Sequence, residues 1–89
     1  MKSSTEQHVS SGMVNAAQLR AARVWLLMSQ DDVAAEAGLT RQTIARLEQD
    51  TSAAQERTLR DVRRVFEARG VQFLFRDGVG VGIHAERTD

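Results

Sequence analysis

Residues 30–48, QDDVAAEAGLTRQTIARLE, contain two short helical patterns on either side of one glycine. Ser29 can cap the first helix, and Asp31 and Asp32 suit the positive end of its dipole. The apolar side of this helix carries Val33, Ala34 and Ala37. Gly38 follows where a left-handed residue is expected to end the helix. We therefore expect a helix of about eight residues that ends in a sharp turn.

The second helix of this stretch is expected over residues 41–49, with Thr40 as its cap. Ile44 and Leu47 lie on one side of it and can pack on the first helix. Positions i, i+1, i+4 and i+5 lie together on the opposite side. These are Arg41, Gln42, Ala45 and Arg46. Two short helices joined by a glycine-containing turn form a helix-turn-helix motif.

The outward side of the second helix carries residue types that read the edges of DNA bases. Arg41 and Arg46 can each donate two hydrogen bonds to guanine, and Gln42 can pair with adenine. The alternative is an ordinary solvated helix surface. The position of these side chains at the start of the second helix of the motif favours DNA recognition.

The remaining chain predicts two more helices and a hairpin. Asn15 can cap a helix over residues 16–28, and Thr58 can cap a helix over residues 59–69 that Gly70 ends. Val71, Phe73 and Phe75 then alternate with other residues, as in a strand. Asp77 and Gly78 form a tight-turn pair before a weaker second strand over residues 79–83.

The expected fold class is mainly α, a four-helix helix-turn-helix domain with a C-terminal β-hairpin. Residues 1–14 lack periodicity and are expected to form a disordered tail. Residues 15–70 are the expected DNA-binding domain, and residues 71–89 the hairpin. We expect the hairpin either to pack on the helices of its own chain or to form a dimer interface. The residues expected to do so are Trp25, Val71, Phe73 and Phe75.

Length and composition exclude several classes of protein. With 89 residues the chain forms one small domain, and its 12 basic and 12 acidic residues balance. It has no cysteine, which excludes a disulfide scaffold and favours a reducing compartment such as the cytoplasm. The expected DNA recognition would place the protein at the nucleoid. No apolar run approaches the length of a membrane span. The two histidines, His8 and His84, belong to no cluster with ligand or catalytic spacing, so we expect no enzyme, no metal and no cofactor.

Residues 19–48 resemble the Cro/phage-repressor type of helix-turn-helix, also called the xenobiotic-response-element family. The matching pieces are Leu19-Arg-Ala-Ala-Arg23, Ser29-Gln30, Val33-Ala34, Ala37-Gly38 and Ile44-Ala-Arg-Leu-Glu48. The whole chain is also similar to short bacterial regulators that end in a GVxF motif and a glycine-rich hairpin, here beginning at Gly70.

The resemblance implies a role for each matching residue. Arg41, Gln42 and Arg46 match base-reading positions. Gln30, Thr40 and Thr43 match positions that contact or lie beside the DNA backbone. Arg23 and Glu48 match a partly buried ion pair, and the alternative is that both are solvated. The loop after the second helix is basic in many relatives, whereas here Arg57 is the first basic residue after Glu48 and the expected phosphate contact of this region.

The resemblance predicts a DNA-binding transcriptional regulator, a repressor that binds double-stranded operator DNA of inverted-repeat symmetry as a homodimer. The balanced charge does not oppose this prediction, because DNA binding needs a local positive surface. The alternative function is a protein-interaction module, an antitoxin or antiactivator with its own protein partner, on the same fold. The absence of a basic residue between Glu48 and Arg57 supports that alternative.

Overall fold

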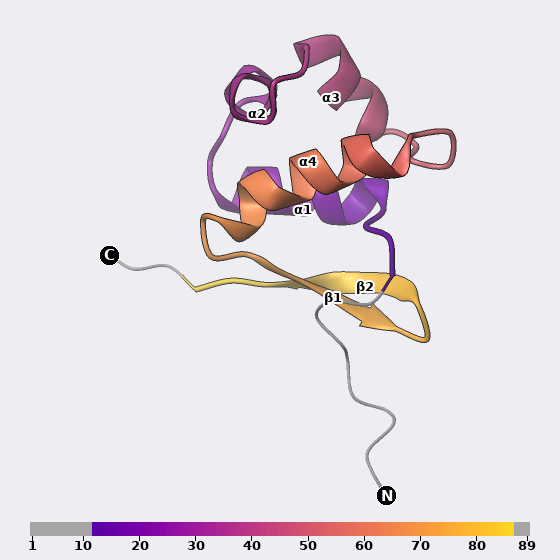
Figure 1. The fold of residues 1–89 in the computed structure, drawn as a ribbon. Coiled ribbons are helices and arrows are strands. Elements are labelled where there is room, and N and C mark those ends of the chain that lie inside the picture. Colours follow the sequence, from indigo (N-terminus) through magenta and orange to yellow (C-terminus); the bar gives the residue numbers. More distant parts are fainter. Residues whose placement is uncertain (1–11, 87–89) are drawn as a thin grey trace, which may run out of the picture.

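The computed structural model describes residues 12–86. Four helices precede a two-stranded antiparallel hairpin, which confirms the expected fold class (Figure 1). The elements are α1 (Ala16–Trp25), α2 (Gln30–Ala37), α3 (Arg41–Leu47), α4 (Glu56–Glu67), β1 (Gln72–Arg76) and β2 (Val79–His84). The hairpin runs along the side of α1 and α4 away from α2 and α3, so α3 lies far from the sheet (Figure 1).

Local sequence signals account for most helix ends. Asn15 and Ser29 each form a reciprocal capping box with the residue three positions later. Gly38 ends α2 in the left-handed region, with φ +73°. A branched side chain there would be strained, which explains the glycine.

Four helix bounds differ from the expected ones, and one of them is the end of α4, which lies at Glu67 and not at residue 69. Helix α1 ends at Trp25, before the expected residue 28, and Leu27 takes a positive φ of 58° in the turn. Helix α3 ends at Leu47, two residues early. Helix α4 begins at Glu56, ahead of the expected Thr58 cap, and its N-cap residue Gln55 makes no side-chain capping bond. Helix α4 forms because its apolar residues recur at helical spacing, so it does not depend on a side-chain cap.

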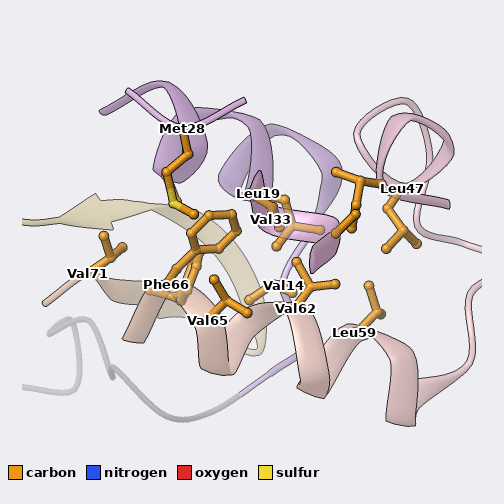
Figure 2. Close-up of a cluster of buried hydrophobic side chains, with 14 of the residues drawn as sticks. Val14, Leu19, Met28, Val33, Leu47, Leu59, Val62, Val65, Phe66 and Val71 are labelled. Carbon is orange, nitrogen blue, oxygen red and sulfur yellow. The ribbon is translucent and has the colours of Figure 1, made fainter. Parts of the chain in front are cut away.

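The core lies between the helices and one face of the hairpin (Figure 2). Figure 2 shows Phe66 and Val65 of α4 reaching toward Met28 and Val33. Phe66 also packs on Phe73, with ring centroids 6.2 Å apart. Val14 is only 3 % exposed and belongs to this core, so the tail expected over residues 1–14 is too long at its C-terminal end. The rest of that expectation, residues 1–11, lies outside the described residues.

The hairpin closes through a turn in which Asp77 and Gly78 both have positive φ, 53° and 80°. This is the geometry that an Asp-Gly pair favours. Phe73 lies opposite Ile83 and Phe75 opposite Gly80, with a shift in register between Leu74 and Phe75. Phe73 and Phe75 are fully buried. They pack within this chain, together with the buried Val71.

Gln18 of α1 holds the hairpin against the helices. Its Nε2 donates to the carbonyl oxygens of Leu74 and Gly82, both at 2.9 Å, where the register shifts. Its Oε1 accepts from the backbone N–H of Asn15, whose own Nδ2 donates to the carbonyl of Gly80. A buried amide with these partners is fully satisfied and fixes the position of the sheet.

Replacing Gly80 by alanine is expected to destabilise the fold by about 1–3 kcal/mol, the usual cost of overpacking. A Cβ at Gly80 would overlap the side chain of Gln18, which cannot move without losing its bonds to both strands. Gly82→Ala is the matched control, since nothing lies within 4 Å of its Cβ position. Urea unfolding followed by circular dichroism measures both variants, and equal stabilities would contradict the role given to Gln18.

Candidate nucleic-acid interface

Helices α2 and α3 form the two arms of the helix-turn-helix motif. Val33 and Ala34 of α2 and Ile44 and Leu47 of α3 are all buried in the common core. Burial of one side of α3 leaves its other side at the surface, and Figure 1 shows α3 at the edge of the helical layer. The motif therefore presents one face of a short helix to solvent on a rigid support.

The exposed face of α3 carries the three residues that were expected to read bases. Arg41, Gln42 and Arg46 are all exposed. They come from consecutive turns of one helix, at positions that share a side. Arg41 Nε lies 3.8 Å from Asp31 Oδ1 of α2, and both side chains stay largely in solvent. Their guanidinium and amide groups are therefore available to a ligand.

Thr40 and Thr43 fix the start of α3. The Oγ1 of Thr40 accepts the backbone N–H of Thr43 at 3.1 Å, and the two hydroxyl oxygens lie 2.9 Å apart. Thr40 is exposed and Thr43 is half-buried. One of the two hydroxyls donates to the other, so the second keeps its O–H to donate to an anion, which the helix dipole favours at this end of α3.

Glu48, the C-cap residue of α3, is the centre of a partly buried polar cluster. Its carboxylate accepts two hydrogen bonds from Arg23, at 2.6 Å from Nε and 2.9 Å from Nη2. Arg23 also donates to the carbonyl of Met28. The Glu48 side chain is 6 % exposed and that of Arg23 19 %. The hydrogen bonds to Glu48 raise the pKa of Arg23 above its ordinary value.

Gln30 joins the same cluster. Its Nε2 donates to Oε1 of Glu48 at 3.2 Å, so the side chain is oriented by the ion pair. Gln30 is half-buried at the start of α2. Its role toward DNA is an expectation from the family resemblance, and the contact with Glu48 shows how the side chain is held at this position.

Sequence reasoning missed Arg20, which donates to the backbone carbonyl of Glu48 and so caps the end of α3. Arg20 precedes Arg23 by three residues, which places both on one side of α1. That spacing was the available signal. Two arginines of α1 thus hold the C-terminal end of α3.

Arg57 lies in the first turn of α4 and is exposed. Residues 50–57 were expected to form either a loop or the frayed start of a helix, and Arg57 lies in the helix. The preceding segment includes Asp50, whose carboxylate accepts both the N–H and the hydroxyl of Ser52. These bonds lower the pKa of Asp50, so a negative charge is fixed just beyond α3.

Two more arginines are engaged within the fold, Arg63 in α4 and Arg69 directly after the C-cap of this helix. Arg69 forms an ion pair with Glu36 of α2, which raises its pKa. Arg63 pairs with Glu67 and stacks over the rings of Phe73 and Phe75, at 5.7 and 5.2 Å from their centroids. These contacts join α4 to α2 and to the hairpin.

Within residues 12–86, no three His, Cys, Asp or Glu side chains come together as metal ligands would. None of the helices in the described part of the chain has the length and apolar character needed to cross a membrane.

Comparison with known protein families identifies the motif. The family model described as Helix-turn-helix (HTH_3) matches residues 19–71, more than half of the chain. A search of the curated proteins gives no match. The matched segment contains α2, α3, α4 and the Arg23–Glu48 pair. The chain therefore belongs to the Cro/C1-type helix-turn-helix family of DNA-binding regulators.

Proposed function

We propose that this protein is a sequence-specific transcriptional repressor that binds its operator as a homodimer and blocks a promoter. Helix α3 enters the major groove, where Arg41, Gln42 and Arg46 read bases. The observation that carries this proposal is the shared exposed face of these three side chains on a helix supported by a buried ion pair. Gln30, Thr40, Thr43 and Arg57 contact the DNA backbone.

The homodimer follows from the small number of bases that one α3 can reach. A two-fold dimer reads two half-sites about one helical turn apart. Val71, Phe73 and Phe75 are buried in the core of the protomer, so they are occupied within it. Trp25 is half-buried at the end of α1. Within residues 12–86, the exposed large apolar side chains are Met13 and, around the end of α1 and along β2, Val24, Leu27, Val79 and Val81. The last four support a dimer contact through the end of α1 and through β2.

The charge distribution supports weak binding to nonspecific DNA. No lysine or arginine lies between Glu48 and Arg57, and Asp50 keeps its charge in that segment. Few phosphate contacts mean a shallow dependence of affinity on salt. Specificity then rests on the base contacts of α3.

In vitro selection of bound DNA from a random pool tests the proposal. We expect an inverted repeat whose half-sites lie about 10 base pairs apart, centre to centre. Light scattering of the protein alone and with the selected duplex gives the number of chains. Recovery of no preferred sequence, at moderate salt and micromolar protein, would contradict the proposal.

The second candidate is a protein-interaction module, an antitoxin or antiactivator with weak DNA binding. The segment between α3 and α4 favours it, since this segment has no basic residue and carries the exposed Asp50. A gel shift on the DNA upstream of its own gene separates the two functions. A shift that survives competitor DNA supports the repressor, and its absence supports the interaction module.

A further inference from the structure

The two neighbouring aspartates at the start of α2 have different surroundings. Asp32 completes the capping box, since its carboxylate accepts the N–H of Ser29 at 2.9 Å. This bond lowers the pKa of Asp32. Asp31 takes no part in the cap, and its carboxylate faces Arg41 of α3. Asp31 therefore suits the positive end of the helix dipole but is not needed for the cap of α2.

The contact between Asp31 and Arg41 involves one particular nitrogen of the arginine. Asp31 Oδ1 lies 3.8 Å from Nε, the inner nitrogen of the guanidinium group. The two terminal nitrogens can form a fork with O6 and N7 of guanine while Nε is engaged elsewhere. An acidic group at Nε can thus orient the fork and leave its outer end open to a base.

The electrostatics of both helix ends favour this arrangement. Arg41 is the first residue of α3, where the positive end of the dipole disfavours a cation. The carboxylate of Asp31 offsets that repulsion and is itself favoured in the first turn of α2. Both side chains are exposed, 61 % for Arg41 and 78 % for Asp31, so the pair contributes little to folding.

We propose that Asp31 is a positioning residue for DNA specificity. It orients Arg41 toward a guanine of the operator, and its negative charge repels the phosphates of nonspecific DNA. The inference rests on the proposed function of α3 as the recognition helix. In a specific complex the aimed fork of Arg41 pairs with its base. On nonspecific DNA, Arg41 stays beside Asp31, and the carboxylate adds a negative charge near the phosphates. Asp31 therefore raises the ratio of specific to nonspecific affinity.

The test compares Asp31→Asn with Asp61→Asn. Asp61 is the matched control because it faces Arg64 at the same distance, 3.8 Å, on α4. For D31N we expect the ratio of affinities for the selected operator and for unrelated duplex to fall about three- to ten-fold at fixed salt. Selectivity for guanine at the position read by Arg41 falls with it. D61N changes the ratio less than about two-fold. Asp31→Glu, which keeps a carboxylate, restores part of it.

A second measurement needs no DNA. In the free protein, D31N is expected to shift the Nε–Hε signal of Arg41 in a ¹H–¹⁵N spectrum, and D61N is expected to leave it in place. An unmoved signal, or an equal change of the ratio of operator affinity to nonspecific affinity in D31N and D61N, would overturn this inference. The proposed function would remain supported if the wild-type protein had selected an operator. Wild-type protein that selects no sequence would instead overturn the proposed function and this inference with it.

Discussion

Glu48→Ala is expected to lower the free energy of unfolding by about 3 kcal/mol, the lower end of the range for breaking a buried ion pair. The substitution leaves the guanidinium of Arg23, only 19 % exposed, without its two hydrogen bonds to carboxylate. It also removes the acceptor of Gln30 Nε2. The lower end applies because Arg23 keeps some contact with water and its bond to the carbonyl of Met28.

A loss of this size is a large fraction of the roughly 5–15 kcal/mol that stabilises a small domain. Urea unfolding measures it, with Asp61→Ala as the control. That variant breaks an ion pair in which Arg64 is 71 % exposed, so its cost is expected to stay below about 1 kcal/mol. If Glu48→Ala were no more destabilising than Asp61→Ala, the Arg23–Glu48 pair would not be the structural support of α3.

Glu48→Gln separates charge from hydrogen bonding at this site. The amide keeps one acceptor oxygen for Arg23 but loses the carboxylate charge, so its stability is expected to lie between those of wild type and alanine. Intermediate stability would assign part of the effect to the charge. Stability equal to that of the alanine variant would assign all of it to the charge.

The parts of this fold that depend on neighbouring residues were predictable from the sequence. Asn15 and Ser29 cap helices as their side chains favour, and Gly38 takes the left-handed conformation that only glycine adopts cheaply. The alternation of Phe73 and Phe75 likewise predicts which face of β1 is buried. Each of these signals lies within a few residues of the feature that it predicts.

The contacts that join distant segments were not predictable in the same way. Gln18 is an ordinary polar residue in a helical pattern, yet its amide reaches carbonyls that are 56 and 64 residues away. Asp31 and Arg41 meet only because α2 and α3 cross. Such pairs depend on tertiary packing, and a polar side chain alone does not indicate its partner. The candidate base-reading residues could therefore be predicted from motif spacing, whereas the contacts that hold them in place could be identified only in the structure.

The combined substitution Arg41→Ala and Arg46→Ala is expected to abolish operator preference while leaving the fold intact. Each bidentate contact with a base contributes about 1–3 kcal/mol of discrimination. The loss of two contacts therefore weakens operator binding by at least about 30-fold. Both side chains are exposed on α3, so their truncation removes no core packing. Footprinting and competition with unrelated DNA at fixed salt measure the change.

The change in charge alone needs a separate control, because removal of two arginines weakens binding to any DNA. Arg60→Ala with Arg64→Ala removes the same charge from exposed positions on α4. This control is expected to weaken operator and unrelated DNA equally, whereas the α3 variant weakens the operator far more. The ratio of the two affinities thus separates base reading from attraction to phosphate. An α3 double variant that protects the same site with unchanged affinity would show that α3 is not the recognition helix.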